Sequence, residues 1–184
     1  MFGFDYHIYM IKRIVPFAYA DSLFEVSAAF YQKFHIKAVL CDLDNTLDSY
    51  DHPFPSERVF ALKRFFSEQG IQMIIVSNNT GRRVRIYAQS LGCRAVCWMM
   101  KPLAGRLKRF IKSEGLKPDE VLLVGDQLMT DILAGNGAGL RTLLVAPISR
   151  KSDPPWTRCN RCFEKRTRYK ILIHRIVPYW RNML

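Results

Sequence analysis

Short apolar runs alternate with helical patterns through the middle of the chain. A strand that is covered on both faces is apolar at nearly every position, so a short apolar run bounded by polar residues or glycine predicts a buried β-strand. Five such runs occur, at Lys37–Cys41, Ile71–Val76, Arg94–Trp98, Val121–Val124 and Arg141–Val145. Between them, apolar residues recur every three or four positions, which is the spacing of one face of an α-helix.

The helical patterns have recognisable starts and stops. Ser56 can cap the first helix and Gly70 follows it as a stop, while Gly92 ends the second. Pro102 suits the first position of a third helix, and Gly115 follows its end. The three apolar faces are Val59, Leu62 and Phe66; Val84, Ala88 and Leu91; and Leu103, Leu107, Phe110 and Ile111.

A fourth helix is expected at about Leu128–Gly137, and Asp21 to about Phe34 predicts an amphipathic helix before the first strand. Strands and helices that alternate with short links imply a parallel sheet with helices on both faces. The pattern therefore predicts an open α/β fold of three layers, with a central parallel sheet of about five strands.

The basic charge of the chain is concentrated at its C-terminal end. The formal net charge is +12, and from Ser149 onward ten Lys or Arg residues face only two acids. Such a surface favours an acidic partner, which could be phosphate, anionic lipid or nucleic acid; a solvated tail that aids solubility is the alternative. We expect an N-terminal aromatic segment with a helix at 1–35, a main domain at 36–147 and a basic aromatic tail at 148–184.

Five cysteines without a secretory signal pattern favour reduced thiols in the cytoplasm. Cys41 lies in an apolar run and is expected in the core. A four-thiolate zinc site of Cys93, Cys97, Cys159 and Cys162 is a less favoured alternative, because the two pairs fall in different parts of the chain. No run of about 18 consecutive apolar residues occurs, so no membrane-spanning helix is expected.

Polar side chains suited to chemistry follow successive predicted strands. In chain order these are Asp42 and Asp44, Ser77, Lys101, and Asp126 and Asp131. The carboxyl ends of parallel strands meet at one edge of a sheet, so these side chains should converge there. Clustered carboxylates repel unless cations compensate them, and an all-oxygen set suits Mg²⁺, which shares its ligand shell with substrate phosphate. Ser77, expected at a helix start, and Lys101 can hold an anion, so the set favours phosphoryl transfer.

The order of these motifs resembles that of the haloacid dehalogenase (HAD) superfamily of aspartate-nucleophile phosphohydrolases. The likeness covers about Ile36 to Ala146, with "DLDNT" as the first motif and "GD" before Asp131 in the fourth. Wider stretches, "IVPFAYADSLFEV", "VSNN", "MKP", "VGDQLMTD" and "GNGAGLRTLLV", resemble the bacterial YqeG family of subclass IIIA, which is related to the mitochondrial phosphatidylglycerophosphate phosphatases. The resemblance implies a HAD-like Rossmannoid fold. Asp48, Ser49 and Tyr50 depart from it, since a more apolar stretch is expected there.

The resemblance also implies a role for each matched residue. Asp42 would be the nucleophile, forming an aspartyl-phosphate, and a Mg²⁺ ligand. Asp44 would act as general acid and then base, with its backbone carbonyl on the metal. Asp126 would complete the metal shell. Lys101 would bridge the nucleophile and the phosphoryl group, and Asp131 would support that shell or Lys101 from behind.

Three further residues would bind or support phosphate: Thr46 in the first motif, and Ser77 with the amide of Asn78 in the second. Relatives that pump ions carry threonine where this chain has Asp44, so an aspartate there implies rapid hydrolysis of the phosphoenzyme. Asp48 has no role in this scheme.

Spacing and the tail bear on the substrate. Ser77 follows Asp42 by 35 positions and Lys101 follows Ser77 by 24, so neither interval has room for a cap domain. A capless site favours a bulky substrate or one presented on a surface. The tail aromatics, Trp156, Tyr169 and Trp180 among basic residues, suit an anionic membrane surface, with a helix docked on the domain as an equal alternative.

Phosphatidylglycerophosphate is the leading substrate on these grounds, for an enzyme in the cytoplasm or peripheral at the membrane. Two alternatives stay open. One is a HAD phosphatase acting on a protein, nucleic-acid or small-molecule phosphate. The other is an RNA- or ribosome-binding module with a vestigial site, which strongly salt-dependent RNA binding would favour.

Overall fold

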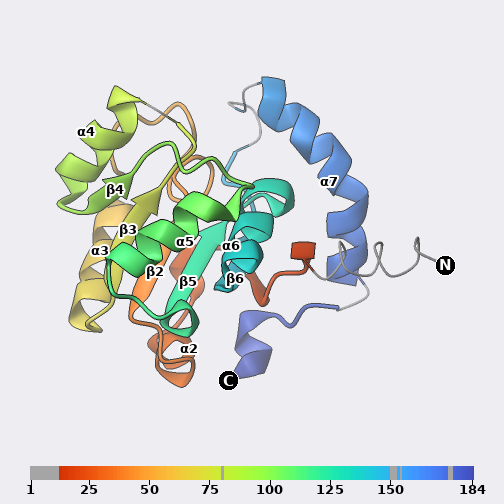
Figure 1. The fold of residues 1–184 in the computed structure, drawn as a ribbon, viewed down its shortest axis with the longest axis horizontal. Helices are drawn as coiled ribbons and strands as arrows, with labels where there is room; N and C mark the ends of the chain where they lie inside the picture. The colour runs from red at the N-terminus through yellow and green to blue at the C-terminus, as the bar shows by residue number, and fades with distance from the viewer. Residues whose placement is uncertain (1–12, 80, 150–152, 154, 174–175) are drawn as a thin grey trace.

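The computed structural model describes residues 13–79, 81–149, 153, 155–173 and 176–184. Its centre is a six-stranded sheet in the order β1-β6-β5-β2-β3-β4, in which every neighbouring pair is parallel (Figure 1). The strands are β1 (Ala18–Ala20), β2 (Ala38–Cys41), β3 (Gln72–Val76), β4 (Arg94–Val96), β5 (Val121–Gly125) and β6 (Arg141–Val145). The predicted open α/β fold is confirmed.

The prediction of about five strands missed β1, the edge strand that pairs with β6. Its three residues, "AYA", are too few to show a period of their own. The predicted strand at Arg94–Trp98 is also shorter than expected, because β4 ends at Val96 and Trp98 has a positive φ of 55°. The other four predicted strands match the observed ones to within a residue at each end.

Helices cover both faces of the sheet, as Figure 1 shows. They are α2 (Ala28–Lys33), α3 (Glu57–Glu68), α4 (Arg82–Leu91), α5 (Ala104–Ser113), α6 (Leu133–Ala138) and α7 (Pro155–Ile173), with short turns of helix at η1 (Leu23–Glu25), η2 (Pro118–Glu120), η3 (Leu128–Ile132) and η4 (Trp180–Met183). One core layer packs α2, α3 and α4 against the sheet, and the other packs α5 and α6 against its opposite face. Alternate strand residues face the two layers, for example Val39 and Leu40 of β2.

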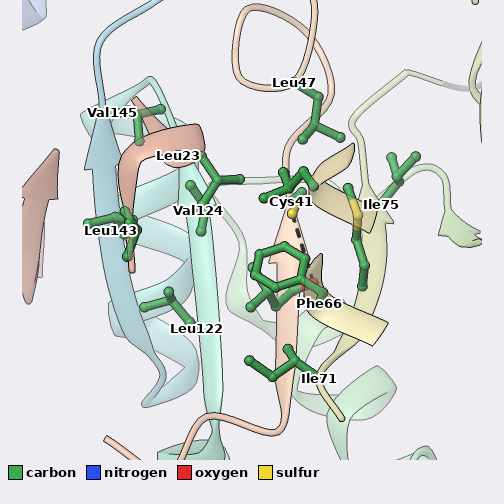
Figure 2. Close-up of a cluster of buried hydrophobic side chains, with 14 of the residues drawn as sticks. Leu23, Cys41, Leu47, Phe66, Ile71, Ile75, Leu122, Val124, Leu143 and Val145 are labelled. Atoms are coloured by element: carbon green, nitrogen blue, oxygen red, sulfur yellow. Dashed lines mark hydrogen bonds between the residues drawn. The ribbon is translucent and has the colours of Figure 1, made fainter. Parts of the chain in front are cut away.

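The larger core layer lies on the face of the sheet that α3 covers. Figure 2 shows Phe66 of α3 over Cys41, with Ile75, Val124 and Leu143 from the neighbouring strands around them. Cys41 is fully buried, as predicted. The other four cysteines are free thiols, and they do not gather into a metal-binding group within the described residues, so the zinc alternative finds no support.

Two helix predictions were wrong in detail. The helix expected from Asp21 to Phe34 is broken, because the Ser22–Glu25 capping box closes the short turn η1 and α2 starts only after Ser27. Pro102 is not in a helix. The side chain of Asn78 bonds both the N–H and the C=O of Lys101, at 2.7 and 2.8 Å, which holds this segment as a loop until α5 begins. Leu103, predicted on the apolar face, is therefore exposed.

The described part of the C-terminal segment packs on the domain. Ile171 of α7 and Val177 join a small core with Leu128, Ile132 and Leu144, and Trp180 is buried in the larger layer. No helix of the described residues is both long and apolar enough to cross a lipid bilayer. Residues 1–12 of the predicted N-terminal segment lie outside the described residues.

Candidate active site

Three adjacent strands carry the predicted site residues to one edge of the sheet. β2 ends at Cys41, directly before Asp42; β3 ends directly before Ser77; and β5 ends directly before Asp126. Because β2 lies between β3 and β5, these three side chains start from neighbouring positions. All three residues are buried, as are Lys101 and Asp131. The predicted convergence at the carboxyl edge is therefore what the fold produces.

Lys101 is the centre of this cluster. Its Nζ donates to Asp42 Oδ1 at 2.6 Å, to Asp131 Oδ1 at 2.7 Å and to the Val76 carbonyl at 3.2 Å. Burial lowers the pKa of Lys101, but the carboxylates of Asp131 and Asp42 outweigh it and raise the pKa above its usual value. Lys101 is thus a fixed positive charge beside the candidate nucleophile.

The carboxylates of the cluster are perturbed by burial. Burial raises the pKa of Asp42 well above its usual range; the Lys101 ammonium opposes this effect and the carboxylates of Asp131 and Asp126 reinforce it. Burial raises the pKa of Asp126 to about 6, against the opposing charge of Arg161. A group of carboxylates that resists ionisation in this way is one that an added cation would stabilise.

The residues present fit a divalent cation. Asp42, Asp126 and Asp131 each offer an oxygen, and these oxygens lie within 4.8 Å of one another. Asp126 Oδ1 is buried and has no hydrogen-bond partner among the described residues. Both oxygens of Asp131 are already engaged, by Lys101 and by the Gln127 N–H at 3.2 Å. Asp42 and Asp126 are thus the carboxylates available to an ion, and Asp131 positions Lys101.

Asp44 lies at the mouth of the site, and its carboxylate is held from the side of α4. Arg83 forms an ion pair with Asp44 Oδ1, and Asn79 Nδ2 donates to Oδ2 at 3.2 Å. Arg83 also donates to the His52 carbonyl at 2.9 Å. Arg83 was not predicted, because its pairing with the loop that follows β2 depends on how α4 is rotated about its axis, and no spacing in the sequence shows that.

The second motif differs from its prediction. Ser77 does not start a helix, since α4 begins at Arg82 with Gly81 as its N-cap. Ser77 Oγ instead accepts the N–H of Asn79 at 3.0 Å. The Asn78 side chain is engaged with the Lys101 backbone, so only its backbone N–H remains for an anion. Thr46 Oγ1 is buried without a hydrogen-bond partner among the described residues, and its role in supporting the loop or phosphate stays a prediction.

Asp48 anchors the loop that follows β2 and carries the first motif. It is buried, and its Oδ2 accepts the hydroxyl of Tyr87 at 2.5 Å and the N–H of Ser56 at 2.9 Å. Arg58 pairs with Oδ1 at 3.4 Å. These bonds join the loop to α3 and α4, which is why a charged residue stands where an apolar one was expected.

A cavity of about 400 Å³ opens over the cluster. It is lined by Asp42, Asp44, Ser77, Lys101 and Asp131, and also by three residues of the C-terminal segment, Asp153, Thr157 and Asn160. Arg161 of the same helix pairs with Asp126 at 2.5 Å. The C-terminal segment therefore contributes to the site, which was not predicted from the sequence.

Sequence comparison shows which known proteins this chain is similar to. A HAD-hydrolase-like family model matches residues 95–151. The chain is 34% identical to the probable phosphatase YqeG of Bacillus subtilis over 158 residues, which is 85% of this chain and 91% of that protein. It is 28% identical to phosphatidylglycerophosphate phosphatase 1 of Arabidopsis thaliana over 127 residues, 64% of this chain but only 36% of that longer protein.

Structural comparison supports the same fold. The cobalt-bound form of deoxy-D-mannose-octulosonate 8-phosphate phosphatase from Haemophilus influenzae matches with a TM-score of 0.50 at 17% identity, covering 70% of this chain and 77% of that one. At this level of identity the likeness concerns the fold alone.

Proposed function

The chain belongs to the YqeG family of HAD phosphatases, and from that premise we propose that it is a Mg²⁺-dependent phosphomonoester hydrolase that works through an aspartyl-phosphate, with phosphatidylglycerophosphate as its leading substrate. One observation carries the proposal. The buried carboxylate of Asp42 lines an open cavity, 2.6 Å from the ammonium of Lys101, and one of its oxygens lies within 4.8 Å of a carboxylate oxygen of Asp126.

The proposed reaction has two steps. Asp42 attacks phosphorus, the ester oxygen leaves, and Asp44 gives that oxygen a proton. Asp44 then takes a proton from water, which attacks the aspartyl-phosphate and frees Asp42 and inorganic phosphate. The ion pair with Arg83 and the hydrogen bond from Asn79 hold the Asp44 carboxyl group in place for both steps. Lys101 offsets the charge that develops on the phosphoryl oxygens.

The other site residues orient these groups. Asp131 holds Lys101 at 2.7 Å, while Ser77 and the backbone N–H of Asn78 would hold phosphate oxygens, with Thr46 supporting the loop. Asp42 and Asp126, with the Asp44 carbonyl, would bind Mg²⁺. When bound, the ion supplies Lewis-acid stabilisation of the phosphoryl group and relieves the carboxylate repulsion.

The lipid substrate is supported by α7 as well as by the Arabidopsis relative, whose name states that substrate. The outward face of α7 carries exposed basic residues among exposed aromatic and aliphatic ones, namely Arg158, Lys165, Arg166 and Lys170 with Phe163, Tyr169 and Ile173. Such a face suits an anionic bilayer, where basic groups bind lipid headgroups and apolar side chains enter the interface. We retain the division at 35 and 147 as a proposal, with the tail serving both the site and the membrane.

A phosphate-release assay tests the enzymatic proposal. With Mg²⁺, the protein should release phosphate from phosphatidylglycerophosphate in mixed micelles, and Asp42→Asn should abolish release while leaving the thermal unfolding midpoint close to that of the parent. Equal inertness of both proteins on lipid, phosphopeptide, nucleotide and sugar phosphates would remove the enzyme proposal and leave the RNA-binding module. Release from the soluble esters alone would favour the other phosphatase alternatives.

A second assay tests the membrane. Because Ile171 and Trp180 are buried, truncating the tail would expose the core, so point variants are the cleaner probe. Phe163→Ser with Tyr169→Ser should reduce binding to vesicles that contain phosphatidylglycerol. Phe60→Ser is the matched control, since Phe60 is also exposed but lies on α3, well away from α7 in Figure 1. Equal binding by all the proteins would exclude α7 as the membrane surface.

A further inference from the structure

Helix α7 is anchored to the active site by its charged side chains. Figure 1 shows it in blue along the side of the domain formed by α6 and β6. Arg161 bridges Asp126 and Asp153, each at 2.5 Å. Arg168 donates to the carbonyls of Asp126 and Val145 at 2.7 and 2.6 Å.

Two more contacts anchor α7, one to the fourth motif and one to the first. Glu164 accepts a hydrogen bond at 2.7 Å from the N–H of Met129, which lies within the fourth motif in the helical turn η3. Just before α7, the buried carboxylate of Asp153 accepts Asn45 Nδ2 at 2.5 Å. Asn45 belongs to the first motif and has a positive φ of 65°, so the start of α7 is tied to the loop that carries the nucleophile.

One face of α7 looks toward the site. Positions 157, 160, 161, 164 and 168 are spaced by three or four, so they share a face of the helix. The later members of this face form the anchoring contacts described above. The first two, Thr157 and Asn160, instead line the cavity over the catalytic aspartates. Neither side chain has a hydrogen-bond partner among the described residues, although Thr157 is only 9% exposed.

A threonine hydroxyl and a carboxamide that face a cavity have the chemistry of a hydroxyl-binding pair, since each can both donate and accept. Asp42, Ser77 and Lys101 line the same cavity as Thr157 and Asn160, so the alcohol of a phosphoester bound to the first set would share the cavity with the second. Among the described residues no cap domain is inserted between the motifs, so α7 is the element outside them that lines the cavity.

We propose that Thr157 and Asn160 are specificity-determining residues that hydrogen-bond a hydroxyl on the leaving alcohol of the substrate. The substrate class is then a phosphomonoester of a hydroxylated alcohol of the glycerol type. This inference rests on the proposed function, but it assigns the recognition to α7, outside the motifs that carry the chemistry. A lipid headgroup and free glycerol phosphate share this chemistry.

The experiment compares substrates with and without the hydroxyl. In mixed micelles, phosphatidylglycerophosphate has a free hydroxyl on its leaving alcohol, whereas phosphatidic acid, also a phosphomonoester, has none. Glycerol 3-phosphate and propyl phosphate form the matched soluble pair. The parent protein should prefer the hydroxylated member in kcat/KM by roughly tenfold, the worth of a hydrogen bond to a neutral group.

Thr157→Val and Asn160→Leu, alone and combined, keep the approximate shape but lose the hydrogen bonds. In the double variant the preference should fall to about one, because activity on the hydroxylated ester falls while activity on the other is kept. Cys159→Val is the control, since Cys159 is exposed on the same helix, and it should keep the full preference.

The outcomes separate the two proposals. If the parent hydrolyses both members of a pair and the double variant keeps the same preference, the role of α7 is wrong and the phosphatase proposal stands. If the parent hydrolyses none of the four esters, the proposed function fails and this inference fails with it. A preference lost only in the micellar pair identifies the lipid as the source of the hydroxyl, and one lost only in the soluble pair identifies free glycerol phosphate.

Discussion

Adding a single methyl group at Gly125, the last residue of β5, should impair the site through Asp131. A Cβ at this position would lie 2.3 Å from Cγ of Asp131, whereas ordinary contacts are 3.4–4 Å. In Gly125→Ala the Asp131 side chain must therefore move by about 1 Å. Since Asp131 holds Lys101 at 2.7 Å, Lys101 would lose its position beside Asp42. A misplacement of about 1 Å costs on the order of 100-fold in rate.

The same substitution at Gly135 is a matched control. Its Cβ would lie 2.4 Å from Cγ2 of Thr142 and 2.9 Å from Cδ2 of Leu123, in the core away from the aspartates. Overpacking should lower the free energy of unfolding of both variants by about 1–3 kcal/mol, as urea denaturation measures. Only Gly125→Ala should lose kcat in a phosphate-release assay. If the two folded variants retain equal kcat, the coupling of Asp131 to Lys101 is refuted.

Three further predictions concern anchoring and metal. Asp48→Ala removes the partner of the Tyr87 hydroxyl and the Ser56 N–H and should lower the free energy of unfolding by about 1–3 kcal/mol; no change in the urea midpoint would contradict its role as an anchor. Arg161→Met removes the ion-pair partner of two buried carboxylates, Asp126 and Asp153, and should lower the free energy of unfolding by about 3–5 kcal/mol in urea denaturation. The exposed Lys165→Met should change this free energy little, and equal effects of the two substitutions would refute the anchoring of α7. Excess EDTA should abolish phosphate release, and added Mg²⁺ should restore it. Mg²⁺ should also raise the midpoint temperature of thermal unfolding, because the ion binds the folded state. Full activity in EDTA would show that the reaction does not require a metal ion.

The central strands of the sheet were predictable because buried parallel strands have continuous apolar runs in their sequence. The strand β1 was not, since three residues at an edge carry no periodicity. Pro102 was misplaced for another reason. The residues around Pro102 have the composition of a helix start. However, the Asn78 side chain forms hydrogen bonds with the backbone of Lys101, and the helix begins only at Ala104. A contact between residues 23 positions apart decides that local structure, and no local signal reports it.

For the site, too, some residues were predictable from the sequence and others were not. Residues that directly follow adjacent parallel strands were placed together from sequence, because the topology fixes where strands end. The partners from helices were missed, namely Arg83 on Asp44 and Arg161 on Asp126. Charge runs are usually solvated, so nothing in the sequence of α7 separates the partly buried Arg161 from an exposed neighbour such as Lys165. The described tail residues pack on the domain, and membrane binding by the outward face of α7 stays a proposal.

Trapping the phosphoenzyme tests the central claim most directly. Asp44→Asn, mixed with p-nitrophenyl phosphate and Mg²⁺, should release a burst of nitrophenolate equal to the enzyme, because this leaving group needs no proton but the second step needs a base. Acid quenching and mass spectrometry should then find the phosphoryl group on Asp42. A burst without phosphate on Asp42, or steady turnover with no trapped enzyme, would contradict Asp42 as the nucleophile.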